Sequence, residues 1–243
     1  MNPFEQFGIK EVADVQFIAL EDNERLDVEK GDIVLFLDTL KISTLETTAE
    51  QTEARGGRGN PSLIIWDYGK EINVTLQDAL FTPESLLVMT GGKELLAEAT
   101  DTVTISKTSL VSKVGDLPAG TYKWISTTTG LRGDSTTAPV AGDMPVRIFE
   151  DVEVNGTNGT AYEVTIDAAN FPGTYKIIGE TVVRNRNGKD TPFQFVIPKA
   201  KMGSEVTFTM EAEGDPSVFD LNLRVLRDDD GTMVKLIKYE LED

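Results

Sequence analysis

Short apolar runs, some of them alternating with polar residues, dominate the N-terminal part of the chain. Residues 12–20 and 32–40 are two such runs, and a charged stretch rich in turn-forming residues separates them. Runs of this length between turn residues are typical of β-strands. Both runs are so apolar that we expect burial on both faces, either within the chain or against a neighbouring molecule.

The same pattern continues in residues 62–68 and 71–76. Gly69 and Lys70 lie between these two runs, and short strands separated by two residues that include a glycine predict a β-hairpin. From Ile72 onwards the apolar residues of the second run recur at every other position, which places them on one face of a strand.

A single short helix is predicted after these strands. Thr82 supplies an N-cap hydroxyl, Pro83 fits the first helical position, and Glu84 places an acid in the first turn. Gly91 and Gly92 end the helix, because glycine readily adopts the left-handed conformation found there. A helix this short should owe its stability to packing against a sheet.

The rest of the chain again predicts β-strands. The candidates are residues 102–107, 120–126, 146–154, 162–166, 174–184, 191–198, 205–212, 218–226 and 232–241. The last five are joined by turn signals such as Asn187-Gly188 and Asp230-Gly231, which predict an antiparallel meander with one buried face. Residues 126–143 are rich in Thr, Gly, Pro and Ala and predict a long surface loop.

These elements together predict a mainly β fold. Many short strands at this spacing favour an antiparallel β-sandwich or barrel with one short flanking α-helix and long assembly loops. A chain of 243 residues suits one elaborated β domain or two small ones. We expect a single domain over residues 1–243, with loop insertions near residues 40–61 and 115–143.

The charge of the chain limits what it can bind. It has 41 acidic and 23 basic residues, which give a formal net charge of −18. Such a chain repels the phosphate backbone of nucleic acids and the anionic headgroups of lipids, so we expect neither a DNA-gripping surface nor membrane binding. Solubility alone is a sufficient explanation of the charge.

The composition also restricts catalysis. The chain contains no Cys and no His, which removes disulfides, thiolate nucleophiles, the commonest general base and the commonest zinc ligands. Carboxylate, Lys, Tyr, Ser and Thr chemistry remains, but no arrangement of these residues indicates a site. We therefore predict no enzyme activity and no catalytic, cofactor-binding or metal-binding residue.

Three short motifs suggest chemistry that their context does not support. Residues 54–60 (ARGGRGN) lack the Lys-Ser/Thr pair and the following helix of a phosphate loop, so we expect a flexible turn. Its Arg55 and Arg58 are expected to pair with a neighbouring acidic subunit. Residues 228–231 (DDDG) lack the ligand spacing of an EF-hand and predict a hairpin turn. Residues 132–134 (RGD) spell an integrin-type tripeptide, which we interpret as a coincidence within a loop.

The N-terminus lacks the basic start and apolar run of a signal peptide, and no apolar run is long enough to span a bilayer. We therefore expect synthesis in a cytoplasm. Trp66 and Trp124 are interpreted as core or interface anchors.

Residues 41–92 resemble the N-terminal half of major tail (tube) proteins from tailed bacteriophages and prophages of Gram-positive hosts. Three elements carry the resemblance: Ala-Arg-Gly-Gly at residues 54–57, Trp-Asp-x-Gly-Lys-Glu at residues 66–71, and Leu-x-Asp-Ala-Leu-Phe-x-x-Glu-Ser at residues 76–85. Residues 210–226, followed by residues 233–239, are similar to the final strands of the same proteins. Residues 115–143 lie outside the resemblance.

The resemblance implies a structural virion protein, made in the cytoplasm of a host bacterium and located in the phage tail. Its copies would form stacked rings, usually of six subunits, around a channel through which DNA passes during ejection. An acidic channel would repel the sliding duplex. Edge strands would pair between subunits. Sheath, tape-measure or tail-terminator proteins are further expected partners, and no cofactor is expected.

The resemblance further implies a long loop that reaches a neighbouring ring. Residues 40–61 fit this loop, because their Thr/Glu-rich first half and Gly-rich second half should not fold alone. The interface candidates in and beside this segment are Leu45, Thr48, Glu50, Glu53, Arg55, Arg58 and Trp66.

Two other functions remain open at this stage. One is another virion structural protein with a similar sandwich, such as a head decoration protein. The other is a carbohydrate-binding or carbohydrate-hydrolysing β domain, which the low aromatic content disfavours, since such proteins bind sugars on aromatic platforms.

Overall fold

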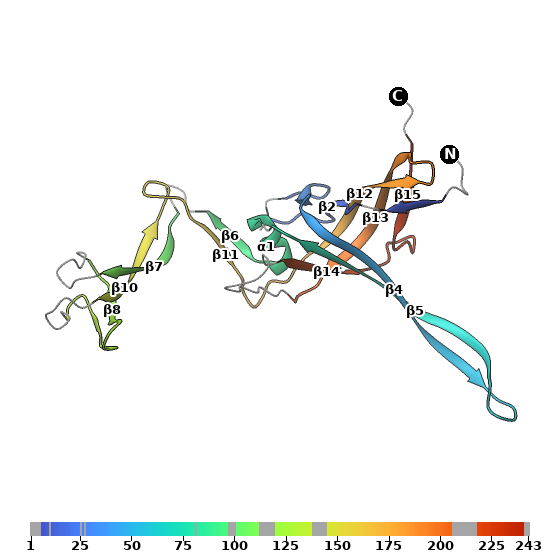
Figure 1. Cartoon of the computed structure of the whole chain (residues 1–243), viewed down its shortest axis with the longest axis horizontal. Helices are drawn as coiled ribbons and strands as arrows, with labels where there is room; N and C mark the ends of the chain where they lie inside the picture. The colour runs from blue at the N-terminus through green and yellow to red at the C-terminus, as the bar shows by residue number, and fades with distance from the viewer. Residues whose placement is uncertain are drawn as a thin grey trace. The chain divides into compact units, whose positions relative to one another are not determined.

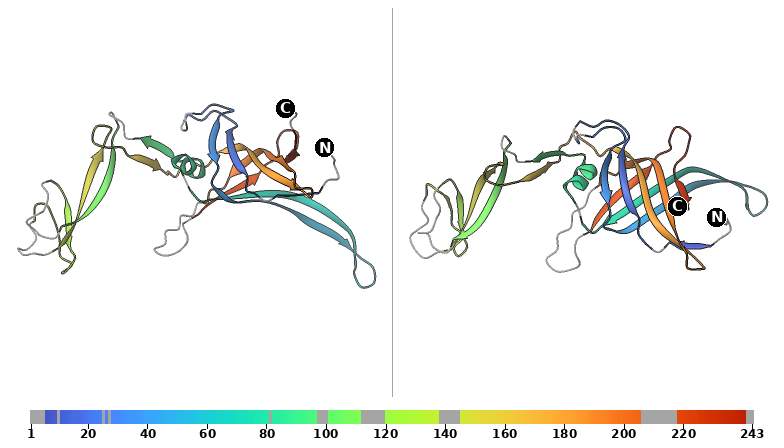
Figure 2. Two further views of the ribbon diagram at one scale, coloured as in Figure 1. Left: turned by 45° about the horizontal axis from the view of Figure 1, so that its top comes forward. Right: turned by 90° about the horizontal axis from the view of Figure 1, so that it is seen from above.

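The computed structural model of the chain describes residues 6–9, 11–24, 26, 28–80, 82–96, 101–111, 120–137, 145–205 and 218–240. The chain divides into two compact units, one of residues 1–94 and 164–243 and one of residues 95–163. Antiparallel strands dominate both units, as Figures 1 and 2 show, and the described residues contain one α-helix. The predicted mainly β class with one short helix is therefore confirmed. That helix, with eight residues, is too short to cross a membrane.

The first unit is built on a nine-stranded sheet. Its strands follow the order β3-β2-β12-β13-β14-β5-β4, and β1 also pairs with β12 while β15 also pairs with β13. All of these pairs are antiparallel. The strands are β1 (Phe7–Ile9), β2 (Asp14–Ala19), β3 (Ile33–Leu37), β4 (Leu40–Arg55), β5 (Ser62–Asp78), β12 (Thr174–Asn185), β13 (Asp190–Met202), β14 (Phe219–Val225) and β15 (Lys235–Lys238).

One face of this sheet encloses the main hydrophobic core. In β14 the burial alternates strictly, with apolar residues inside and polar residues outside. Phe17 of β2 is fully buried and meets the ring of Tyr175 edge-on, with the ring centroids 6.0 Å apart. Val88 and Met89 of the helix join the same cluster. The helix is therefore stabilised by packing against the sheet, as its length requires.

The helix α1 (Pro83–Thr90) forms as the sequence predicts. Thr82 accepts a hydrogen bond from the backbone of Ser85 at 3.2 Å, and the backbone of Thr82 donates to the Ser85 hydroxyl at 3.0 Å. This reciprocal pair satisfies backbone groups that the first turn leaves free. Gly91 ends the helix in the left-handed conformation, with φ 68°, and donates to the carbonyl of Leu87 at 2.8 Å.

The hairpin predicted at Gly69-Lys70 is wrong. Strand β5 runs through both residues, and its register with β4 shifts there so that Ala49 lies opposite both. Gly69 has φ 60°, the geometry of a β-bulge in which glycine supplies the left-handed residue. Sequence alone did not separate a two-residue turn from a bulge, because both favour the same glycine.

The loop predicted near residues 40–61 is also wrong for most of its length. Residues 40–55 form strand β4, and only residues 56–61 turn the chain back into β5. The Thr-rich sequence of β4 folds because β5 supplies a partner along nearly all of it. An arrangement predicted to be a flexible loop is thus a long β-hairpin.

The expectation that residues 12–20 and 32–40 are buried on both faces does not hold within the described residues. Strands β2 and β3 bury one face in the core. On β3, Ile33 is 58% exposed and Phe36 is 51% exposed. On β2 the residues of the other face, Gln16 and Ile18, are only half-buried.

The meander predicted for the last third is only partly correct. Asn187-Gly188 does form the turn between β12 and β13. The turn at Asp230-Gly231 is also present, but the strands on either side of it, β14 and β15, both pair with β13 and not with each other. The predicted strand at residues 205–212 lies almost entirely outside the described residues.

The second unit contains a four-stranded antiparallel sheet with the order β7-β10-β8-β9. A separate two-stranded sheet pairs β6 with β11. The loop predicted over residues 115–143 is partly wrong, because two short paired strands lie within it, and residues 112–119 and 138–144 lie outside the described part. The strands of the four-stranded sheet are β7 (Val103–Val111), β8 (Lys123–Ser126), β9 (Arg132–Asp134) and β10 (Val146–Val154). The strands of the two-stranded sheet are β6 (Lys93–Leu96) and β11 (Tyr162–Thr165), each with residues in both units.

The tripeptide at residues 132–134 has a structural role in this unit. Gly133 lies opposite Trp124, and a Cβ added to it would stand 2.4 Å from the indole ring. The Trp124 side chain is 5% exposed, and its Nε1 donates to the carbonyls of Asp134 and Thr137, both at 3.0 Å. Hydrogen bonds from the hydroxyls of Thr136 and Thr137 lower the pKa of the Asp134 carboxyl below its usual value. The motif therefore seats a buried tryptophan.

Replacing Gly133 with alanine should destabilise the second unit, because the new methyl group overlaps the indole of Trp124. We expect the free energy of unfolding to fall by about 1–3 kcal/mol, as for other overpacked sites. Denaturant titration followed by Trp124 fluorescence in a Trp66→Phe background measures this. The exposed neighbour Leu131, changed to alanine, should cost less than about 0.5 kcal/mol; equal losses in the two variants would contradict the packing argument.

Candidate functional site

A two-stranded arm extends from the sheet of the first unit. Strand β14 pairs with β5 only as far as Asn73, so beyond this point β4 and β5 pair with each other alone. We call residues 47–71 the arm. Figure 1 shows its two strands running past the end of the rest of the sheet. An isolated two-stranded hairpin is at best marginally stable in water, so an arm of this length requires further contacts.

The arm exposes a continuous apolar run on β5. Leu63, Ile64, Ile65 and Trp66 are 64%, 52%, 57% and 50% exposed, and Tyr68 is 52% exposed. Successive residues of a strand point to opposite faces, so this run makes both faces of the arm apolar. Strands with continuous apolar runs are normally covered on both sides, and no described residue covers these.

The end of the arm is a tight turn. Gly57 and Gly59 have φ values of 83° and 91°, and Asn60 has φ 52°. Asn60 donates its backbone N–H to the carbonyl of Gly57 at 3.1 Å. This Gly-rich segment is the turn expected at residues 54–60, and a strand, not a helix, follows it.

The structure divides the interface candidates into two groups. Leu45 lies at the base of the hairpin, opposite Val74, and is 41% exposed. The other six lie on the arm or in its turn, and all of them are exposed. In register along the arm, Thr48 lies opposite Glu71, Glu50 opposite Tyr68, Thr52 opposite Trp66, Glu53 opposite Ile65 and Arg55 opposite Ser62.

The acidic and basic candidates near the end of the arm contact each other. The guanidinium of Arg55 donates to the carboxylate of Glu53. Hydrogen bonds from Ser62 and then from Arg55 lower the pKa of the Glu53 carboxyl below its usual value. Arg55 thus has a partner within its own chain.

The residues that sequence reasoning missed are Leu63, Ile64 and Ile65, although their unbroken apolar run was a visible signal.

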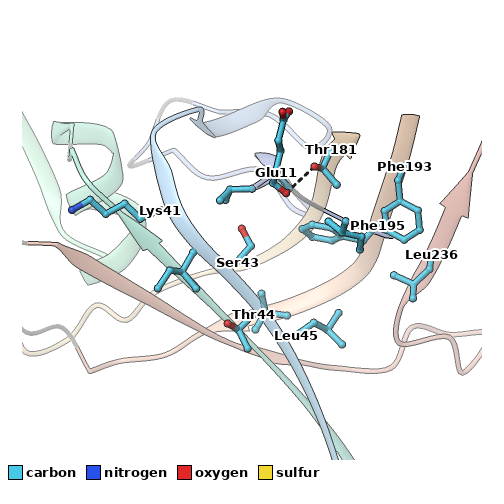
Figure 3. Close-up of a pocket in the computed structure, with 14 residues that line it drawn as sticks. Glu11, Lys41, Ser43, Thr44, Leu45, Thr181, Phe193, Phe195 and Leu236 are labelled. Atoms are coloured by element: carbon cyan, nitrogen blue, oxygen red, sulfur yellow. Dashed lines mark hydrogen bonds between the residues drawn. The ribbon is translucent and has the colours of Figure 1, made fainter. Parts of the chain in front are cut away.

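A groove of about 500 Å³ lies beside the base of the arm. Figure 3 shows Leu45, Phe193, Phe195 and Leu236 around it, so that β4, β13 and β15 all contribute apolar walls. Across it the hydroxyl of Thr181 donates to the backbone carbonyl of Glu11 at 3.0 Å. The groove offers mainly apolar contacts and a few hydroxyl groups.

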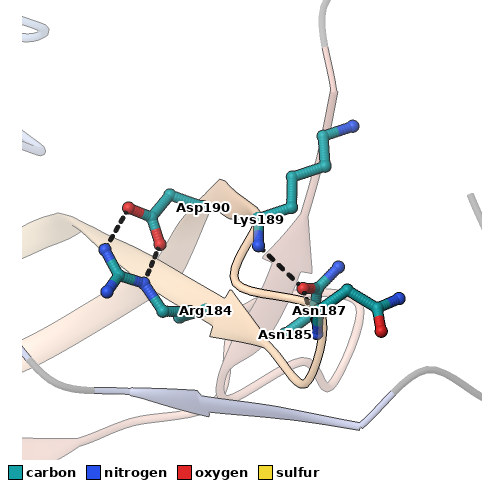
Figure 4. Close-up of polar contacts among 5 residues, drawn as sticks. All are labelled: Arg184, Asn185, Asn187, Lys189 and Asp190. Carbon is teal, nitrogen blue, oxygen red and sulfur yellow. Dashed lines mark hydrogen bonds and ion pairs between the residues drawn. The ribbon is translucent and has the colours of Figure 1, made fainter.

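Ion pairs in the described residues lie at the surface. Arg184 contacts both carboxylate oxygens of Asp190, at 2.5 and 2.6 Å, beside the β12–β13 turn in Figure 4. In that turn the backbone N–H of Lys189 donates to the side chain of Asn185 at 2.9 Å. The hydrogen bond from Arg184 to Asp190 raises the pKa of the Arg184 guanidinium above its ordinary value. Exposed pairs of this kind contribute little stability. No group of three acids in the described ranges is arranged to hold a metal ion.

A protein-family model described as the YomU/Tube protein family matches residues 7–238. The match runs from the first residue of β1 to the last residue of β15 and so spans both units. No curated protein matches the chain.

Proposed function

We propose a structural role in a phage tail tube for this chain, which belongs to the YomU/Tube protein family. Its copies assemble into stacked rings, each of six subunits, and the stacked rings form a channel for DNA. The chain acts through self-association and not through catalysis. Its partners are other copies of itself, together with sheath, tape-measure or tail-terminator proteins at the tube surface and ends.

The observation that carries the proposal is the exposed apolar run on the arm. Leu63 to Trp66 would lose their contact with water if another copy covered both faces of the arm. Burial of apolar surface contributes roughly 25 cal/mol per Å², so large side chains in a cluster supply a substantial driving force. The six candidates on the arm and in its turn then lie at the contact between copies, and Leu45 lies where the arm leaves the sheet.

The edges of the large sheet support the same role. Strands β3 and β4 end the order of the described strands, and each presents one edge without a strand partner there. Unpaired edges pair readily with other chains unless they are protected. Edge pairing between copies would convert an aggregation hazard into a regular assembly.

The charge of the chain suits a conduit for DNA. With a net charge of −18 in every copy, a channel lined by carboxylates repels the duplex and lets it slide without sticking. A channel with positive potential in an assembled tube would contradict this part of the proposal.

Assembly of the purified chain tests the proposal. We expect rods or stacked rings in negative-stain electron microscopy, with a mass that rises in multiples of the 26.6 kDa subunit as the concentration increases. A chain that stays monomeric at every concentration, and also in the presence of preformed tubes, would contradict the role. A glycan-dependent rise in thermal stability of such a monomer would instead favour a carbohydrate-binding domain.

A further inference from the structure

The four-stranded sheet of the second unit has one covered face and one open face. The register places Trp124, Val146 and Ile148 on one face, where all three are buried. The residues that alternate with them lie on the other face. An antiparallel sheet normally shows one face to solvent, so the open face needs further distinguishing features before it indicates a site.

Large apolar side chains are the first such feature. Leu110 on β7 is 63% exposed and Phe149 on β10 is 43% exposed, and Ile125 on β8 is half-buried on the same face. These residues lie on three adjacent strands at one end of the sheet. An exposed apolar group framed by polar residues is typical of a protein interface.

Three cations at the same end are the second feature. Arg147 lies opposite Ile125, which lies opposite Arg132, and Lys123 lies one row away. Among the residues that the structure describes, no ion pair involves any of these three cations. The acid opposite Lys123 is Asp134, whose carboxylate accepts hydrogen bonds within its own turn. Three cations gathered at one end of a face favour the approach of anionic groups, so this end suits a partner that carries carboxylates.

The remaining acids of the open face lie further along β10. They are Asp151, which accepts a hydrogen bond from Ser106 at 2.6 Å, and Glu153. The face is thus divided into an acidic end and a cationic, apolar end. We call the second of these the cationic end; it consists of Leu110, Lys123, Ile125, Arg132, Arg147 and Phe149.

One face of the arm has the complementary chemistry. Glu50 of the arm and Glu46, just before it at the base of the hairpin, lie on the same side of β4 as Thr52, whose partner on β5 is Trp66. Tyr68, opposite Glu50, shares this face. Neither Glu46 nor Glu50 takes part in an ion pair within the described ranges. Two carboxylates outside any ion pair of the described ranges and two exposed aromatic rings therefore share one face of the hairpin, along about 20 Å of strand.

We propose that this face of the arm docks on the cationic end of the second unit of another copy. The proposal rests on the tube-subunit function above and names the surface that receives the arm. Arg132 and Arg147 pair with the carboxylates of Glu46 and Glu50, and a guanidinium also stacks well on an aromatic ring such as Trp66. The apolar side chains of both surfaces are covered in the same contact.

The charge of the whole chain favours a second copy over a nucleic acid as the occupant. Each copy carries −18, and this field repels a polyanion before it reaches three local cations. In a second copy the carboxylates lie beside apolar side chains. Burial of these side chains in the contact offsets the long-range repulsion between the two copies. The contact is therefore expected to depend on salt.

Charge reversal in the full-length chain tests the proposal. One variant carries Arg132→Glu and Arg147→Glu, a second carries Glu46→Lys and Glu50→Lys, and a third carries all four changes. Each double reversal should raise the concentration needed for assembly at least about tenfold. In the variant with all four changes, that concentration should be within about threefold of the value for the unchanged chain, because attraction is restored with the signs exchanged. Pelleting assays and negative stain measure the assembled fraction.

Lys107→Glu is the matched control. Lys107 is an exposed cation of the same sheet, but its register opposite Glu150 places it on the covered side and outside the cationic end. Assembly of this variant should match that of the unchanged chain. Circular dichroism and thermal unfolding establish that every variant is folded.

The outcomes separate this inference from the proposed function. If the Arg132/Arg147 reversal assembles like the unchanged chain while loss of the arm's apolar residues prevents assembly, the arm docks elsewhere and only this inference fails. If the Arg132/Arg147 reversal blocks assembly and the variant with all four changes also fails to assemble, the cationic end contacts a different partner and the inference is again overturned. If loss of the arm's apolar residues also leaves assembly intact, the role of the arm fails together with this inference. The proposed function itself fails only if the unchanged chain stays monomeric at every concentration.

Discussion

Replacing Ile64 and Trp66 together with serine should prevent assembly without unfolding the subunit. The two residues share one face of the arm, opposite Ala54 and Thr52, and both are at least half exposed in the single chain. Buried aromatic anchors at interfaces typically contribute about 2 kcal/mol or more each. Loss of that amount raises the concentration needed for assembly about 30-fold. The subunit should remain folded, because these side chains contribute nothing to its core.

Sedimentation across a concentration series, with negative stain of the pellets, measures this effect. Ile166→Ser is the matched control, since Ile166 is 62% exposed in the same unit but lies outside the arm. The control should assemble normally, and both variants should keep the melting temperature of the unchanged chain within a few degrees. Normal rods from the Ile64/Trp66 variant would refute the role assigned to the arm.

Replacing Gly91 with alanine should strongly destabilise the first unit. At φ 68° an L side chain costs about 1–2 kcal/mol. The added Cβ would also stand 2.4 Å from the carbonyl carbon and 2.5 Å from the carbonyl oxygen of Phe171. Because the obstacle is backbone and not a flexible side chain, the helix or the segment at Phe171 has to move. We expect a total loss of roughly 3 kcal/mol or more in the free energy of unfolding.

Gly188→Ala separates the two causes. Gly188 also has a positive φ, 83°, but a Cβ there would have nothing within 4 Å. This variant should therefore lose only the backbone contribution, about 1–2 kcal/mol. Urea denaturation of both variants provides the comparison. Equal losses at the two positions would show that the contact between Gly91 and Phe171 costs nothing.

The elements set by local chemistry were predictable from the sequence. The helix was placed at its correct ends because Thr82, Pro83 and Gly91 each act on the backbone beside them. The alternation in β14 and the turn at Gly188 were found for the same reason. Such signals need no knowledge of the rest of the fold.

The elements that depend on distant partners were not predictable in the same way. The sequence around Gly69 predicts a turn, since only the register with Ala49 on β4 shows that it forms a bulge. The sequence of residues 40–61 predicts a loop, because the first strand of the arm is polar and gains its structure from pairing with β5. Strand β15 pairs with β13 and not with β14, its neighbour in sequence, and no local residue determines this pairing.

The candidate site was partly visible in the sequence. The resemblance implies a contact segment at residues 40–61, and six of the seven interface candidates lie on the arm or in its turn. The apolar run from Leu63 to Trp66 was assigned to a strand, and its exposure became evident only from the structure. The cationic end combines residues of four strands, so its assembly from Leu110, Arg132 and Arg147 required the register of the second unit.

The accessibility of a single thiol on the arm tests the central claim most directly. The chain contains no cysteine, so Thr52→Cys introduces a unique thiol opposite Trp66 while leaving the apolar run intact. Maleimide labelling should be rapid in unassembled subunits and at least about tenfold slower in rods, because a neighbouring copy covers the arm. A thiol that reacts equally fast in subunits and in rods would show that the arm stays in solvent and would contradict the account.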